Sequence, residues 1–253
     1  METTNIETKR NLKYFMAKGP SVFLYVSLAL LAVGVLLCVV AGRETGLLMA
    51  GILLVLVGLC VMMFASGGKA NEVDIDMTCM ALTKDLEEAA TKRFEVYERS
   101  YLRVIKPITI RGYEFSDDPS LFIKKASDNK VRTNLFNGVY MFFTNDNAYI
   151  YRRHLSVTDE SVMADDYHKV KYEKLVGAFL EEAEYPYMQG KKEKVYHDLK
   201  FVIKTVDGEV LRMSVEEGAD VDKAIKDINH IIDIKHKNPE ERLATEGGKY
   251  SNR

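Results

Sequence analysis

Two uncharged apolar runs near the N-terminus constrain the fold of this chain more than any other feature. The first covers residues 22–42 and the second residues 47–65, and neither contains Asp, Glu, Lys, Arg or His. A helix rises about 1.5 Å per residue, so roughly 20 residues cross the ~30 Å apolar core of a bilayer. Each run is therefore long enough to cross a membrane once.

The link between the two runs, residues 42–46, has the sequence GRETG. A single fused helix would bury Arg43 and Glu44 in the bilayer, at a cost of several kcal/mol. A break at the link leaves both charges in water, and its two glycines supply the dihedral freedom of a tight turn. We therefore predict a transmembrane helical hairpin over residues 21–66.

A secretory signal is the alternative explanation of residues 1–41, with residues 39–41 (VVA) as the cleavage site. The apolar region of such signals is usually about 7–15 residues long, and here it is longer. The polar stretch before it is also long. The hairpin is the favoured interpretation, and the signal peptide remains open.

The basic residues around the hairpin predict its orientation. They flank its outer ends, at Lys9, Arg10, Lys13, Lys18 and Lys69, whereas the link carries only Arg43 beside Glu44. Loops rich in lysine and arginine stay in the cytoplasm. The expected location is the cell membrane, multi-pass, with both termini cytoplasmic and residues 1–20 as a basic cytoplasmic leader.

Small residues recur every seven positions along each run. They are Ser27, Gly34 and Ala41 in the first and Gly51, Gly58 and Ala65 in the second. Small residues allow helices to approach closely, so we predict that these positions pack the hairpin. Counted from the link, Gly34 lies level with Val55 and Gly58 with Leu31. Packing between hairpins of different chains and chance placement are the alternatives.

The rest of the chain alternates between helix and strand patterns. Residues 76–101 have helical spacing and form most of a linker segment, residues 67–104. About seven strands follow. Single strands are expected at residues 107–115, 121–123, near 131 and at 168–180. One hairpin is expected on both sides of the Asn-Asp-Asn turn at 145–147, and another pairs residues 194–206 with 209–215 around Asp207-Gly208. Tight turns between them predict an antiparallel sheet or barrel.

An amphipathic helix closes this region. Asp220 is the expected N-cap, and an apolar stripe runs from Val221 to Ile232. Lys235 and His236 suit the negative end of the helix dipole, and Pro239 ends the pattern. Residues 239–253 are polar and are expected to be a disordered tail.

Three stretches of the sequence carry a family resemblance. They are RTNLFNGVYMFFTNDNAYIYRRHLSV, VKYEKLVGAF and TVDGEVLRMSVEEGADVDKAIKDINHII. Together they resemble uncharacterised bacterial membrane proteins with a pleckstrin-homology (PH)-like domain after two spans. The resemblance implies an α+β fold, in which a PH-like antiparallel β-barrel with a C-terminal helix occupies residues 105–238 on the cytoplasmic side. It implies no activity, because a fold does not carry function by itself.

Composition and motifs exclude several function classes. A net charge of −2 disfavours a nucleic-acid binder. The three cysteines and five histidines are scattered, without the spacing of a metal site or a disulfide framework. No motif of a nucleophile, a phosphate loop or a zinc hydrolase occurs. We therefore expect a protein that is not an enzyme, with no catalytic residues, no metal and no cofactor.

Three functions remain. The first is a membrane-anchored scaffold or assembly factor, whose PH-like domain binds a protein partner or another copy of itself. The second is a lipid head-group sensor, in which Lys124, Lys125, Lys130 and Arg132 contact lipid phosphate, although nearby aspartates weaken their field. The third is an accessory subunit of a larger membrane complex.

Overall fold

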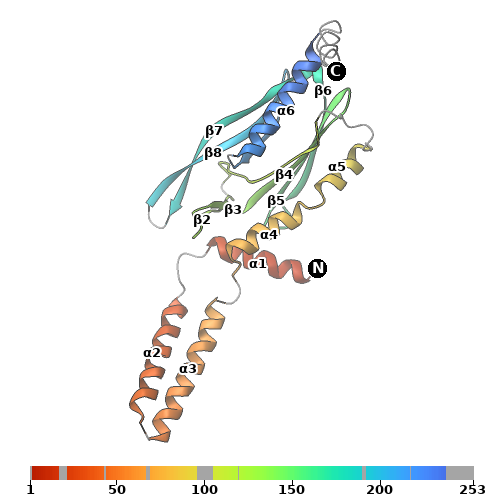
Figure 1. Cartoon of the computed structure of the whole chain (residues 1–253). Helices are drawn as coiled ribbons and strands as arrows, with labels where there is room; N and C mark the ends of the chain where they lie inside the picture. The colour runs from red at the N-terminus through yellow and green to blue at the C-terminus, as the bar shows by residue number, and fades with distance from the viewer. Residues whose placement is uncertain are drawn as a thin grey trace, which may run out of the picture. The chain divides into compact units, whose positions relative to one another are not determined.

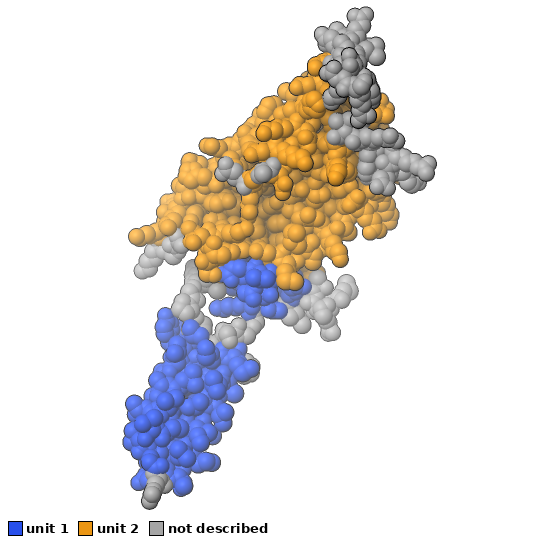
Figure 2. All heavy atoms as spheres, viewed as in Figure 1, with its two compact units in different colours: residues 1–75 blue, residues 76–253 orange. Residues whose placement is uncertain are grey.

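The computed structural model describes residues 2–16, 22–42, 44–66, 69–95, 105–118, 120–189, 192–216 and 218–237. The chain divides into two compact units, residues 1–75 and residues 76–253 (Figure 2). Each unit is described by itself.

The first unit is helical. After α1 (Glu2–Met16), the helices α2 (Val22–Val40) and α3 (Thr45–Ser66) lie side by side and are joined by a short turn (Figure 1). Their mean hydropathy, 2.8 and 2.7, and their length are sufficient to cross a membrane. The prediction of two long apolar helices near the N-terminus is confirmed, and Arg43 of the link lies outside the described residues.

Helices α2 and α3 pack closely because glycines lie at their contact. A Cβ atom built on Gly51 would lie 2.9 Å from the carbonyl oxygen of Gly34, and one built on Gly34 would lie 2.8 Å from Val55 Cγ2. A Cβ atom on Gly58 would lie 3.0 Å from Leu31 Cγ. A larger residue would therefore push the two helices apart.

Helix α1 packs on the segment that follows α3. The backbone N–H of Ala70 donates to the carbonyl oxygen of Arg10 at 3.2 Å, and Arg10 Nη2 lies 3.2 Å from Asp74 Oδ2. Asn11 and Tyr14 of α1 are buried. These contacts join the chain before the first apolar helix to the chain after the second.

The second unit contains three antiparallel sheets. One has the strand order β1-β4-β5-β6 and consists of β1 (Ile108–Tyr113), β4 (Leu135–Phe143), β5 (Asn147–Ser156) and β6 (Met163–Lys171). Another has the order β7-β8-β9, with β7 (Leu175–Gln189), β8 (Lys192–Thr205) and β9 (Gly208–Val215). A small hairpin joins β2 (Ile123–Lys125) to β3 (Val131–Thr133). The helices are α4 (Glu72–Leu82), which begins in the first unit, α5 (Leu86–Phe94) and α6 (Ala219–His236).

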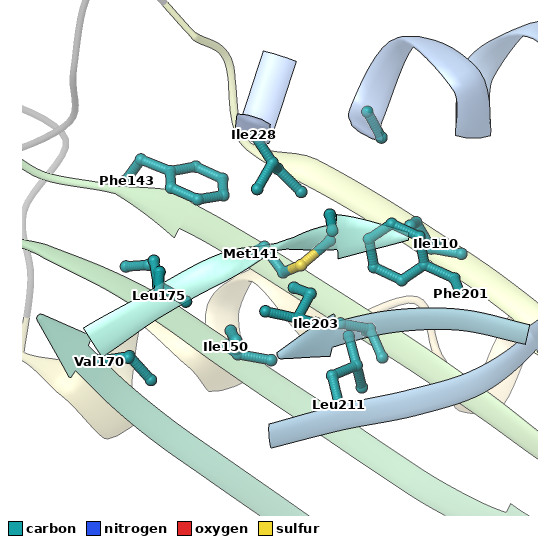
Figure 3. Close-up of a cluster of buried hydrophobic side chains, with 14 of the residues drawn as sticks. Ile110, Met141, Phe143, Ile150, Val170, Leu175, Phe201, Ile203, Leu211 and Ile228 are labelled. Carbon is teal, nitrogen blue, oxygen red and sulfur yellow. The ribbon is translucent and has the colours of Figure 1, made fainter. Parts of the chain in front are cut away.

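The main core of this unit is formed by the two larger sheets and α6. Ile228 of α6 is buried among strand residues that include Met141, Phe143 and Leu175 (Figure 3). Strand β4 is buried along its whole length, because its other face carries Tyr140 and Phe142 into a second cluster with α5.

The observed elements confirm the α+β layout, with two long apolar helices first and antiparallel sheets followed by a C-terminal helix. Within the described residues the sheets do not close into one hydrogen-bonded barrel, since each keeps separate edge strands. The part of the chain that the structure describes contains nine strands instead of the predicted seven or so. The predicted disordered tail, residues 239–253, lies outside the described residues.

Three local predictions are wrong. Residues 168–180 are not one strand, because a 3₁₀ turn at Tyr172–Lys174 carries the chain from β6 to β7. The N-cap of α6 is Gly218, and Asp220 lies in the first turn. The helix predicted over residues 76–101 is interrupted between Leu82 and Leu86, and its predicted end falls outside the described residues.

Tertiary contacts explain the break between α4 and α5. The guanidinium of Arg111 donates to the Thr83 hydroxyl at 3.0 Å and to its carbonyl oxygen at 3.1 Å. Arg153 donates to the Leu82 carbonyl oxygen and to the Asp85 carboxylate. The turn also approaches β4 at Gly138, where a Cβ atom would lie 2.6 Å from Leu86. Strand residues that are distant in sequence therefore fix where α4 ends.

Candidate functional site

A cleft of about 520 Å³ lies in the second unit. Strand β1 lines it along its whole length, and this strand is an edge of its sheet. The other walls come from α4, the β2–β3 hairpin, β8, β9 and the start of α6. Strand β9 passes close to β1 at Gly112, since a Cβ atom there would lie 2.4 Å from the Ser214 carbonyl oxygen.

An arginine joins α4 to the β2–β3 hairpin beside the cleft. The Arg132 side chain is only 2% exposed, and its guanidinium contacts Asp76 at 2.7–2.8 Å and Asp128 at 2.7–2.9 Å. The Tyr113 hydroxyl donates to Asp76 at 2.5 Å. Both carboxylates are thus bound to the same buried cation.

The ionisation of this cluster follows from its contacts. Hydrogen bonds from Arg132 hold the pKa of Asp76 below its usual value and lower that of Asp128 to about 2. The two carboxylates in turn raise the pKa of Arg132. Burial raises the pKa of the Cys79 thiol to about 12, and burial also raises the pKa of Tyr113. At neutral pH the cluster therefore contains one guanidinium cation, two ionised carboxylates and a protonated thiol.

A second polar cluster surrounds Lys200, whose side chain is 1% exposed. Its Nζ donates to Glu114 Oε1 at 2.9 Å, to the Phe115 carbonyl oxygen at 2.5 Å and to Ser214 Oγ at 2.7 Å. The Ser214 hydroxyl donates to Asp198 Oδ2 at 2.8 Å. Buried cations persist when they are paired and hydrogen-bonded in this way.

The Lys200 cluster extends into the four-stranded sheet. The side-chain amide of Asn137 donates to Glu114, and the Asn137 Oδ1 atom lies 2.9 Å from Nδ1 of His154. Burial lowers the pKa of His154. The hydrogen-bonded chain therefore runs from β8 through the end of β1 to β4 and β5.

The 2.7 Å distance between Lys200 Nζ and Ser214 Oγ is the only feature that the cluster shares with a catalytic serine–lysine pair. Burial alone would lower the pKa of Lys200, but the carboxylates of Glu114 and Asp198 raise it above its usual value. A lysine held protonated cannot take the proton of Ser214. Among the described residues, no group of three or more His, Cys, Asp or Glu side chains is placed to hold a metal ion. We therefore assign the Lys200 cluster a structural role, in which it connects neighbouring strands.

The four basic residues predicted to contact lipid lie on or beside the β2–β3 hairpin. Lys124 pairs across the ladder with Arg132, and Lys125 pairs with Val131. Lys130 is exposed and lies 3.4 Å from Glu216. Arg132 is the buried cation described above, so its guanidinium already binds two carboxylates.

The residues predicted to pack the hairpin also have defined places. Ser27, Gly34, Ala41, Gly51 and Gly58 are buried in the first unit. The side chain of Ala65 is not among the described ones.

The polar clusters were not expected from the sequence, although one part of it indicates them. Asp198 and Lys200 lie two residues apart in the apolar run of β8, where alternate residues share a face. Two opposite charges on one face of a buried strand predict an internal ion pair. Their partners Glu114 and Ser214 have no such indication.

Comparisons with known proteins add no relative. No family model, curated protein or solved structure matches this chain. The PH-like resemblance therefore depends on the residues that carry it.

Proposed function

We propose that this chain is a membrane-anchored, non-enzymatic scaffold that binds a partner protein in the cytoplasm. Anchoring is supported by α2 and α3, which are apolar, uncharged and packed through glycines. A PH-like domain is supported by the order of the second unit, in which four-stranded and three-stranded antiparallel sheets are followed by α6.

One observation carries the binding function: the cleft follows the free edge of β1. An extended segment of a partner can add to such an edge as a further strand, with main-chain hydrogen bonds for affinity and pockets for alternate side chains. The carboxylates of Asp76, Asp198, Glu216 and Asp220 line the cleft, and they outnumber the lining cations Arg111 and Lys130. The cleft therefore suits a peptide better than a phosphate.

The direction of the β1 hydrogen bonds defines the docking groups. The N–H of Glu114 donates to Leu135 of β4, and bonding alternates along an antiparallel ladder. The main-chain groups of Thr109 and Arg111 therefore point toward the free edge. Thr109 is also exposed, so a partner strand can reach it.

The two other functions have less support. A lipid sensor would need the Arg132 charge, which two carboxylates already bind. An accessory subunit held through glycine faces would need Gly34 and Gly51, and these lie against each other inside the hairpin.

The test removes one donor from the free edge. Thr109→Pro deletes the N–H that faces the cleft, at an edge position where sheets accept proline. Thr109→Val keeps the N–H and is the matched control. The full chain and both variants are purified from membranes in mild detergent, and the bound proteins are quantified by mass spectrometry.

We expect a defined partner to accompany the wild type and Thr109→Val but not Thr109→Pro. The melting temperature of each variant shows whether the fold is intact. Equal recovery with a folded Thr109→Pro would refute docking at β1.

A further inference from the structure

Helix α4 has an exposed apolar stripe, of which only Met80 also lines the cleft. Val73, Met77 and Met80 are 62%, 66% and 54% exposed. They are spaced i, i+4, i+7, so they form one continuous strip along the helix. The opposite side of α4 is buried at Ile75 and Cys79. Single exposed apolar residues are common on proteins, but an ordered strip opposite a buried face indicates a second apolar partner.

The length of the chain limits what that partner can be. Helix α3 ends at Ser66 and α4 begins at Glu72, so only residues 67–71 separate them. A connection this short spans at most about 20 Å when fully extended. If α3 crosses the membrane, α4 begins within that distance of the bilayer surface.

Two of the three carboxylates of α4 have a cation beside them, since Asp74 lies 3.2 Å from Arg10 and Asp76 binds Arg132. Helix α1, which carries Arg10, also presents Lys9 and Lys13 to solvent and ends in the exposed Met16. Lysines beside an apolar strip are typical of helices that lie at the membrane interface.

We propose that the Val73–Met77–Met80 strip of α4 rests on the lipid bilayer, with its methionines between the head groups and the acyl chains. The contact would hold α4 at the membrane surface. The proposal depends on the membrane anchoring proposed above, and its central residue, Met77, does not line the β1 cleft.

The chain contains no tryptophan, so one introduced residue gives an unambiguous fluorescent probe. Met77→Trp places the probe on the strip. Val206→Trp is the control, because Val206 is also apolar and 68% exposed but lies in the β8–β9 turn. Val57→Trp in α3 tests the anchoring itself.

Each full-length variant is reconstituted at one chain per lipid nanodisc. Half of the discs contain phosphatidylcholine brominated near the head-group end of the acyl chains, and half contain lipid brominated near the terminal methyl. Bromine quenches tryptophan only at contact distance. We expect Met77→Trp to lose most of its emission with the first lipid and little with the second, while Val206→Trp keeps its emission with both.

The outcomes separate the two proposals. If Val57→Trp is not quenched by the deep bromines, membrane anchoring itself fails. If Val57→Trp is quenched but Met77→Trp is not, the strip does not contact lipid and must face a protein or a second copy of the chain. Equal quenching at positions 77 and 206 would also overturn the assignment to α4.

Discussion

Arg132 joins two segments that are far apart in the sequence, α4 and the β2–β3 hairpin. Its guanidinium binds Asp76 of α4 and Asp128 of the β2–β3 turn, while its backbone belongs to β3. A charge buried to this degree is stable only with partners, and removing one member of such a group leaves the others uncompensated. The position therefore behaves as a structural joint, although its charge suggested a surface contact.

Arg132→Met is expected to lower the free energy of unfolding by about 3 kcal/mol, at the low end of the range for a buried ion pair because the carboxylates keep some contact with water. Arg212→Met is the matched control. Arg212 pairs with Glu181 and Glu209 at the surface, so its loss is expected to cost about 1 kcal/mol or less. Chemical denaturation of the detergent-solubilised chain, followed by circular dichroism, measures both.

The pH dependence of stability gives a second readout for the same pair of variants. Asp76 and Asp128 have pKa values below their ordinary 3.8 in the folded chain, and that of Asp128 is about 2. The two carboxylates therefore contribute fully to the free energy of unfolding above about pH 4, and this contribution is lost as the pH falls toward 2. Arg132→Met should flatten this acid dependence, and Arg212→Met should not. An unchanged acid profile in Arg132→Met would show that the carboxylates do not depend on Arg132.

At the scale of elements, the hairpin depends on glycines at the contact of its two helices. Without a hydrophobic driving force between helices in lipid, close van der Waals packing has to hold them together. The side chain of Cys38 lies at the same contact, where a Cβ atom on Gly51 would be 2.6 Å from its Sγ atom. This proximity allows a direct chemical test.

Gly51→Cys is expected to form a disulfide with Cys38 under mild oxidation. The control is Ile52→Cys, one position further along α3 and 44% exposed, which should not cross-link. Counting free thiols by mass spectrometry distinguishes the two. Equal cross-linking of both variants would mean that Gly51 does not lie at the helix contact.

At the scale of the whole molecule, the orientation in the membrane is the next quantity to measure. Cys79 is a poor reporter of orientation, because its side chain is fully buried and its pKa is raised to about 12. Such a thiol does not react with an external reagent on either side of a membrane. Exposed positions are needed instead.

Thr45→Cys and Val206→Cys, each in a Cys38→Ala/Cys60→Ala background, provide these positions. The lysine and arginine bias predicts that an impermeant maleimide labels Thr45→Cys in intact cells and labels Val206→Cys only after permeabilisation. The mass shift of the labelled chain on a gel measures the labelling of each variant. The opposite labelling would invert the topology and place the second unit outside the cell.

The sequence predicted those parts of the molecule that depend on neighbouring residues. Uncharged runs predict α2 and α3, and Asp207-Gly208 predicts the β8–β9 hairpin. The wrong predictions concern features that depend on contacts between residues far apart in the sequence. The end of α4 depends on Arg111 and Arg153, and Arg132 finds Asp76 at a separation of 56 residues. Local periodicity contains no information about such pairs, so the sequence predicts a lipid contact for Arg132 and not a buried ion pair.

The contact between α1 and the start of α4 also sets an order of events during biosynthesis. Arg10 and Asp74 are 64 residues apart, and both apolar helices lie between them. At a synthesis rate of about 5–20 residues per second, roughly 3–13 s pass between the two residues. The Arg10–Asp74 pair can therefore form only after the ribosome has synthesised both apolar helices, which lie between the two residues.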